Sequence, residues 1–186
     1  MADGGERVAL VLGGAATVWD DVKAALELGE FSGVVAANDV GAEWPGHLDA
    51  WVSLHADKFK LWAQRRAKRG FAPAAAVFAH ESRKGTAPGV THATEWKFPG
   101  QRETGSSGLF ALKVALVDLG FDKAVLCGVP MSVDGAHFFD TRPWRAAMSH
   151  RQGWSEALPH IMHKARSMGG FTADLLGRPT TEWLGG

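Results

Sequence analysis

Two glycine turns hold the groups best suited to binding an anion. Gly13-Gly14 follows the apolar run Arg7–Leu12, and Gly105-Ser106-Ser107-Gly108 precedes the apolar segment Leu109–Leu119. Backbone N–H groups at the start of a helix attract phosphate and carboxylate groups, and the second turn adds two hydroxyl donors. A tight strand-to-helix turn and a serine N-cap are the alternatives that need no ligand. Neither turn has the spacing of a dinucleotide-binding fingerprint or of a P-loop.

Polar residues also follow the next two apolar runs of the chain. Asn38 and Asp39 come after Val34–Ala37, and His55 comes after Ala50–Leu54. Ligands of open parallel sheets bind beyond the carboxyl ends of the strands, near the point where the strand order reverses. We therefore predict one ligand site built from Gly13, Gly14, Asn38, Asp39, His55, Ser106, Ser107 and Gly108.

The stretch from Met131 to Gln152 is a predicted long polar loop with the composition of an active-site segment. It carries His150 together with Arg142, Arg145 and Arg151. A long polar loop in a compact domain is usually functional. An imidazole with a pKa of about 6.5 can accept a hydroxyl proton at neutral pH, and arginines hold diphosphate or carboxylate groups. A mobile loop whose charges face water is the alternative.

The eight histidines raise the question of a metal, which the sequence answers in the negative. His160 and His163 fit one helical face, but they lack a neighbouring thiolate or an H-E-x-x-H pattern. His137 with Asp134 and Asp140 is a slightly better candidate for a divalent ion, but polar loops supply such trios by chance. We predict no metal site in this chain.

Composition narrows the class of protein. The 186 residues hold 20 Lys+Arg and 20 Asp+Glu, and 46% are hydrophobic, which is typical of one globular domain. Balanced charge disfavours nucleic acid as a partner, and the basic run Lys58–Arg69 is interpreted as a solvated helix face. The acidic start Met1–Arg7 and the absence of any apolar run of about 18 residues predict neither a signal peptide nor a membrane span.

The only cysteine is Cys127, which excludes an intramolecular disulfide bond and fits a reducing, cytoplasmic compartment. The residue lies at the end of a predicted strand, before Gly128. We interpret it as a small buried apolar side chain and not as a nucleophile.

Short apolar runs alternate with helical patterns along the chain. This order predicts an α/β fold over residues 1–186, a single Rossmann-like, doubly wound domain with a mainly parallel sheet and helices on both faces. After the polar loop we expect a last helix over Gly153–Met168, a strand or extended segment over Phe171–Leu176, and a C-terminal tail over 177–186. The expected strands are Arg7–Leu12, Val34–Ala37, Ala50–Leu54, Ala74–Phe78, Ala124–Cys127 and an edge strand within Thr91–Phe98.

The order of these motifs resembles a known group of proteins. The segments LVLGGAATV, VVAAND, TGSSGLFALKVALVDLGF and KAVLCGVPM are similar to segments of the bacterial CMP-sialic acid-dependent sialyltransferases. They are also similar to the related domain shared by motility-associated glycosyltransferases and an archaeal pterin diphosphokinase. The resemblance covers Val8–Met131. The first loop lacks the Asn-Gly-Pro-Ser pattern of those families, and Pro130 stands where an acidic residue is usual.

The resemblance implies a nucleotide-binding transferase, one that moves a sugar or a similar group from a nucleotide donor, such as a cytidine nucleotide, to an acceptor hydroxyl. It implies that the first glycine turn and Asn38 contact the nucleotide, and that His55 stands where an Asn of the family does so. His150, ahead of the last helix, corresponds best to the general base, and Arg145 or Arg151 is expected on the leaving group. A non-catalytic nucleotide sensor and an ATP-dependent diphosphokinase-like phosphotransferase are the alternatives. A need for Mg²⁺ and the oligomeric state stay open.

Overall fold

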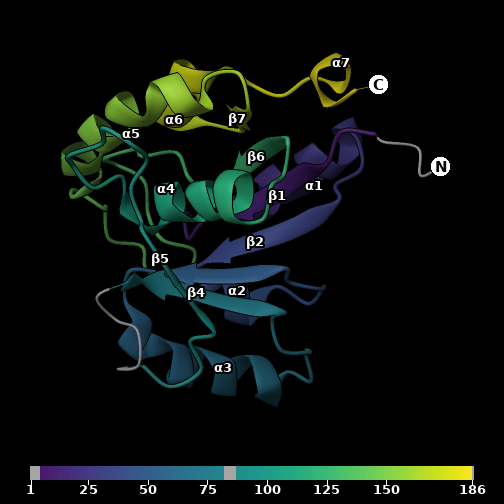
Figure 1. Cartoon of the computed structure of the whole chain (residues 1–186), viewed down its shortest axis with the longest axis vertical. Coiled ribbons are helices and arrows are strands. Elements are labelled where there is room, and N and C mark those ends of the chain that lie inside the picture. Colours follow the sequence, from purple (N-terminus) through teal and green to yellow (C-terminus); the bar gives the residue numbers. More distant parts are fainter. Residues whose placement is uncertain (1–4, 82–86, 186) are drawn as a thin grey trace.

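A parallel sheet forms the centre of the computed structural model, which describes residues 5–81 and 87–185 (Figure 1). The first four residues of the acidic N-terminus lie outside these ranges. Within them the strand order is β5-β4-β3-β2-β1-β6-β7, and every pairing is parallel. The strands are β1 (Val8–Leu12), β2 (Gly33–Ala37), β3 (Ala50–Ser53), β4 (Ala76–His80), β5 (His92–Thr94), β6 (Lys123–Cys127) and β7 (Ala165–Ser167).

Helices cover both faces of this sheet. Two separate buried clusters, one on each face, contain the apolar residues of the helices. On one face lie α1 (Val18–Leu28), α2 (Val40–Glu43) and α3 (Phe59–Lys68), the last preceded by the 3₁₀ turn η1 (Ala56–Lys58). On the other lie α4 (Ser106–Lys113), its π-helical continuation η3 (Val114–Asp118), α5 (Ala147–Ile161) and α6 (Gly170–Leu176).

Strand β1 shows why both faces are covered. All of its residues are buried, and the side chains of Ala9 and Val11 join one cluster while those of Val8, Leu10 and Leu12 join the other. Successive side chains of a strand point to opposite faces, so a continuous apolar run buries itself only between two layers of helices. The predicted doubly wound α/β fold is confirmed.

The strand order reverses beside β1. The chain runs from β1 out to β5, and α4 then returns it to β6 on the other side of β1. Leu12 pairs with Cys127 of β6 and with Ala36 of β2, so these three strands end at one level. The reversal therefore gathers the residues that follow β1, β2 and β6 at one edge of the sheet.

The C-terminal third differs from the prediction. Helix α5 begins at Ala147, inside the predicted loop, and ends at Ile161, where a last helix over Gly153–Met168 was expected. Phe171–Leu176, expected to be extended, belongs to α6, which buries Thr172, Ala173 and Leu176 along one side. The predicted tail includes α7 (Thr181–Leu184), whose Trp183 ring faces the charged groups of Lys123 and Arg166.

One arginine of the basic run departs from the expected solvated face. Arg66 of α3 is 1% exposed, and its guanidinium donates to the carbonyl oxygens of Gly41, Gly46 and Ala72. Burial lowers the pKa of Arg66. The other basic side chains of α3 face solvent, so Arg66 has a structural role that the pattern of charges did not reveal.

Candidate functional site

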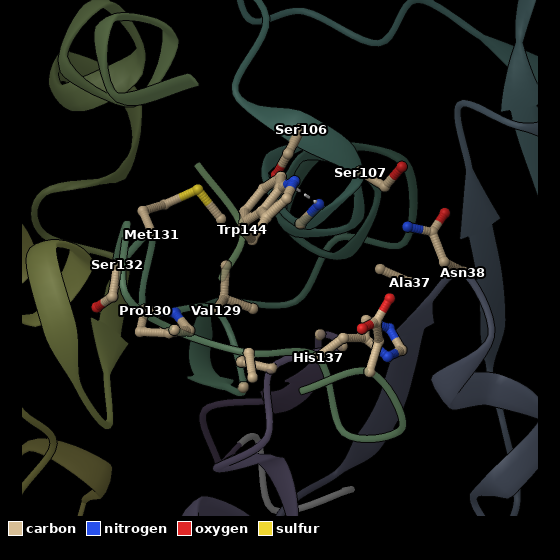
Figure 2. Close-up of a pocket in the computed structure, with 18 of the residues that line it drawn as sticks. Ala37, Asn38, Ser106, Ser107, Val129, Pro130, Met131, Ser132, His137 and Trp144 are labelled. Atoms are coloured by element: carbon tan, nitrogen blue, oxygen red, sulfur yellow. Dashed lines mark hydrogen bonds between the residues drawn. The ribbon is translucent and has the colours of Figure 1, made fainter. Parts of the chain in front are cut away.

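A cleft of about 840 Å³ opens where the strand order reverses (Figure 2). The residues predicted to bind a ligand all line it, and so does His150. The opposite wall comes from the segment between β6 and α5, which supplies Met131, Phe139, Arg142 and Trp144. The lining residues predicted from sequence are Gly13, Gly14, Asn38, Asp39, His55, Ser106, Ser107, Gly108 and His150.

Backbone N–H groups of the first glycine turn donate hydrogen bonds to other parts of the protein. The N–H of Gly13 donates to the Cys127 carbonyl at 2.8 Å, and the N–H of Ala15 donates to the Gly128 carbonyl at 3.0 Å. The N–H of Ala16 donates to the loop after β6. A Cβ on Gly13 would lie 2.5 Å from the Gly128 oxygen. The glycine is therefore explained by close packing of two strand ends, and these three amides are not free to bind an anion.

His137 closes the cleft over the first turn. Its Nε2 lies 3.2 Å from Asp39 Oδ1, and its Nδ1 accepts from the N–H of Phe139 at 3.4 Å. An amide can only donate, so Nδ1 is the unprotonated nitrogen and Nε2 carries the hydrogen that is donated to Asp39. A Cβ on Gly14 would lie 2.5 Å from this Nε2. Both ring nitrogens are engaged, which gives His137 a structural role at the cleft.

The ring of His137 thus pairs with Asp39 and not with Asp134 or Asp140, its partners in the weaker hypothesis of a metal site. Among the residues that the structure describes, no three His, Cys, Asp or Glu side chains form a group that could hold a metal ion. His160, the other candidate, donates from Nε2 to the Pro99 carbonyl oxygen at 2.8 Å, and its ring stacks on Phe98.

The serine turn forms the start of α4. Gly105 occupies the N-cap position without a side-chain hydrogen bond, but the hydroxyl of the next residue, Ser106, caps an amide of the first turn, as the alternative that needs no ligand expects. Ser106 has a φ of 73°, and its Oγ accepts from the N–H of Gly108 at 3.2 Å. The Oγ of Ser107 accepts from the N–H of Leu54 at 3.3 Å. The first-turn amides of a helix lack intrahelical partners and carry a partial positive charge. The Gly108 amide is already bonded to Ser106 Oγ, so the turn can offer an anion only its other first-turn amides.

Asn38 is held in a left-handed conformation at the end of β2. Its φ is 58°, which Asn tolerates better than most residues, and its carbonyl accepts from Trp51 Nε1. Its Oδ1 accepts from Ser53 Oγ at 2.7 Å, and Ser53 Oγ accepts in turn from the N–H of His55. Because the oxygen of the amide is engaged, the Nδ2 donor faces the cleft, as Figure 2 shows.

His150 has the geometry of a proton acceptor. Its Nδ1 lies 3.3 Å from the Thr104 carbonyl oxygen, and the ring stacks on Trp144 at 5.4 Å between centroids. A carbonyl can only accept, so Nδ1 carries the hydrogen and the lone pair stays on Nε2. In contrast to His137, this imidazole is oriented through one nitrogen and keeps the other for a ligand.

Two of the predicted arginines lie elsewhere. Arg151 donates through Nε and Nη2 to the Met131 carbonyl at 3.0 and 2.9 Å, and its guanidinium lies over the Phe171 ring. Arg145 is exposed. Neither residue is among those that line the cleft. Arg151 instead fixes the start of the loop after β6 against α5 and α6.

Arg142 is the arginine that lines the cleft. Its Nε lies 3.0 Å from both carboxylate oxygens of Asp140, two residues earlier. Hydrogen bonds from Arg142 lower the pKa of Asp140 to about 2, and the same pairing raises the pKa of Arg142. Sequence reasoning named Arg142 as a possible anion ligand but could not separate it from its two neighbours, since only the path of the loop does so.

Sequence reasoning missed the apolar side of the cleft. Phe139 and Trp144 are 53% and 39% exposed, and Met131, which has a φ of 49°, is buried. Aromatic side chains in an otherwise polar loop were the available signal. Exposed aromatic rings beside a polar turn suit a ligand that has both an anionic group and a ring.

Cys127 lies below the cleft floor and is fully buried. Burial, and then the charge of Asp21, raise the pKa of its thiol far above the usual range. The interpretation of Cys127 as a small buried apolar residue agrees with this environment.

The chain matches no family model, no curated protein and no solved structure. No helix in the described part of the chain is both long and apolar enough to cross a membrane.

Proposed function

We propose that the protein binds a nucleotide donor in this cleft and transfers a sugar or a similar group from it to an acceptor hydroxyl. One observation carries the proposal: the carbonyl of Thr104 orients His150, and the next residue, Gly105, caps the anion-binding turn of α4. The proposed proton acceptor and the proposed phosphate site are thus held by adjacent residues of one segment. Transfer of a group from a phosphate to a hydroxyl is accelerated by both, since the first accepts the hydroxyl proton and the second holds the phosphate.

The donor half of the site follows from the polar groups. The phosphate lies against the first turn of α4, where Ser107 supplies a backbone amide, and Arg142 adds a guanidinium from the opposite wall. Asn38 Nδ2 and the Asp39 carboxylate, behind this turn at the end of β2, bind the base and ribose. A volume of about 840 Å³ lies within the range of small-molecule sites, about 300–1,000 Å³, and accommodates a nucleotide together with the group it carries.

In the proposed transfer, one bond of the transferred carbon forms as another breaks. The acceptor oxygen forms a bond to the transferred carbon while the bond from that carbon to the donor phosphate oxygen breaks. The acceptor proton passes to Nε2 of His150, a contribution of roughly 10²–10⁴-fold in rate for general bases. The electron pair leaves on the phosphate oxygen, whose charge is stabilised by the α4 N-terminus and Arg142. Arg142 takes the role that the sequence had given to Arg145 or Arg151.

A binding screen tests the proposal. Thermal unfolding is followed with CMP, UMP, AMP, GMP and the corresponding nucleotide sugars, because a ligand at 100 times its Kd stabilises by about 2.7 kcal/mol. We expect one nucleotide to raise Tm, and we expect Ser107→Val to reduce the rise. Donor consumption is then measured with His150→Gln, which should retain binding and lose turnover. Failure of every nucleotide to bind would contradict the proposal, and a His150→Gln variant with normal turnover would remove the base.

A further inference from the structure

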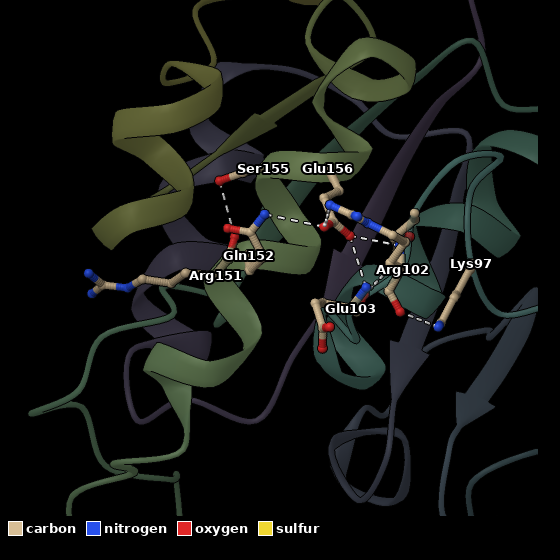
Figure 3. A network of polar contacts seen from close by, with 8 residues as sticks. Lys97, Arg102, Glu103, Arg151, Gln152, Ser155 and Glu156 are labelled. Atoms are coloured by element: carbon tan, nitrogen blue, oxygen red, sulfur yellow. Dashed lines mark hydrogen bonds and ion pairs between the residues drawn. The ribbon is translucent and has the colours of Figure 1, made fainter.

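Glu156 of α5 binds the segment that precedes α4, as its contacts with Arg102 and Glu103 show (Figure 3). Its Oε2 accepts from the N–H groups of Arg102 at 2.7 Å and Glu103 at 2.9 Å. Its Oε1 accepts from Gln152 Nε2 at 3.2 Å and lies 3.5 Å from the Arg102 guanidinium. One carboxylate thus binds two successive backbone amides of a segment that has no regular secondary structure.

Gly153 lets α5 approach the same segment closely. A Cβ at this position would lie 2.5 Å from the Thr104 carbonyl carbon and 2.6 Å from the carbonyl oxygens of Glu103 and Thr104. Gly153 is buried in the middle of a helix, where glycine is otherwise unfavourable by about 1 kcal/mol relative to alanine. The close approach explains why a glycine stands here.

His150, Gly153 and Glu156 follow one another at intervals of three residues, so they share a face of α5. All three contact residues 102–104: Glu156 at the first two amides, Gly153 at the carbonyls of Glu103 and Thr104, and His150 at the Thr104 carbonyl. The next residue caps α4. The position of this segment on α5 therefore determines both the tautomer of the imidazole and the placement of the phosphate turn beside it.

We propose that Glu156 is a positioning residue, which fixes the segment 102–104 on α5. The Thr104 carbonyl then keeps the lone pair of His150 on Nε2, and the His150 ring stays beside the α4 turn. The role of this geometry in transfer rests on the proposed function. The backbone hydrogen bonds from Glu103 and Arg102, and then the side-chain hydrogen bond from Gln152, lower the pKa of Glu156 to about 2. The carboxylate is therefore charged throughout the neutral range.

The test uses the full chain without any ligand. Glu156→Ala and Glu156→Gln are compared with Glu27→Ala, a change at an exposed glutamate of α1 on the other face of the sheet. Long-range ¹⁵N–¹H NMR of the imidazoles reports which ring nitrogen carries the hydrogen, and the His150 signals are assigned from their loss in His150→Gln. Signals of His137, which does not contact segment 102–104, monitor folding.

We expect the wild type and Glu27→Ala to show the Nδ1–H form of His150. Glu156→Ala should shift the tautomer ratio toward Nε2–H by roughly fivefold, the change that the loss of one typical hydrogen bond produces. Glu156→Gln, which keeps one oxygen acceptor, should shift it less, and this variant carries the test if the alanine variant does not fold. An unchanged His150 tautomer in a folded Glu156 variant would overturn the proposal.

Measurements of turnover test the role of Glu156 separately from the proposed nucleotide-dependent transfer. If a nucleotide donor is consumed, Glu156→Ala should lower kcat by at least about tenfold, since it disorders the base, while Glu27→Ala leaves kcat unchanged. A stabilising role alone would lower Tm without moving the tautomer. If no nucleotide binds to any form of the protein, the proposed function fails, yet the tautomer measurement still decides whether Glu156 positions His150.

Discussion

Gly13 and Gly128 are in contact through backbone alone: an added Cβ on Gly13 would lie 2.5 Å from the carbonyl oxygen of Gly128 and 2.5 Å from a methyl carbon of Val129. The contact joins the ends of β1 and β6, the strands between which the order reverses. Gly128 itself has a φ of +69°, a conformation that favours glycine.

This contact predicts that Gly13→Ala destabilises the fold even without ligand. Overpacking of this kind costs about 1–3 kcal/mol, and the loss is measured as a lower urea midpoint at constant m-value. Gly5→Ala is the matched control, because an added Cβ there meets nothing within 4 Å. A Gly13→Ala variant as stable as the wild type but weaker in nucleotide binding would mean that the glycine serves the ligand instead.

The thiol of Cys127 should report the opening of the same strand end. Because the side chain is fully buried and burial raises the pKa of the thiol, a disulfide reagent at pH 8 should react only with molecules that open. The rate should therefore rise steeply through the urea transition. Rapid stoichiometric reaction of the native protein would contradict this burial.

Local patterns predicted strands β1 to β6 and the turn before α4 because each one lies within a few residues of chain. Strand β7 was missed, since it lies within the segment that was expected to be helical. The start of α5 had no such signal, since Ala146 occupies the N-cap position without a side-chain hydrogen bond. The pairing of His137 with Asp39 joins residues 98 positions apart, and the choice of Arg142 over Arg151 follows from the path of one loop. Contacts of this kind depend on packing and not on spacing in the sequence.

The pairing of Arg142 with Asp140 predicts that a bound phosphate competes with an internal carboxylate. Asp140→Asn should strengthen binding of the nucleotide found by the screen by roughly fivefold, because the guanidinium loses a charged partner. Arg142→Ala should weaken binding by about tenfold, and both effects should shrink in high salt, since the pair is exposed. Isothermal titration measures the affinities. Arg65→Ala, at an exposed arginine of α3, is the charge control.

If Asp140→Asn leaves the affinity unchanged while Arg142→Ala weakens binding, Arg142 acts without competition from Asp140. If neither change alters the affinity, the phosphate does not reach this wall of the cleft.

The low pKa of Glu156 predicts how the free energy of unfolding depends on pH. Its pKa is about 2 in the folded protein, below the ordinary value of 4.5. A depressed pKa means that the carboxylate contributes stability that is fully present above pH 4.5 and is lost as the pH falls toward 2. The difference in unfolding free energy between the wild type and Glu156→Gln should therefore be largest above pH 4.5 and should shrink steadily below it.

Urea unfolding at intervals from pH 7 to pH 2.5 measures this difference. Asp140 has a similarly low pKa, but it is present in both proteins and cancels in the comparison. A difference between the wild type and Glu156→Gln that does not change with pH would mean that the charge of Glu156 contributes nothing to holding residues 102–104 on α5. The amide oxygen of glutamine would then be an equal acceptor for the two backbone N–H groups, and the attachment of residues 102–104 to α5 would depend on hydrogen-bond geometry alone.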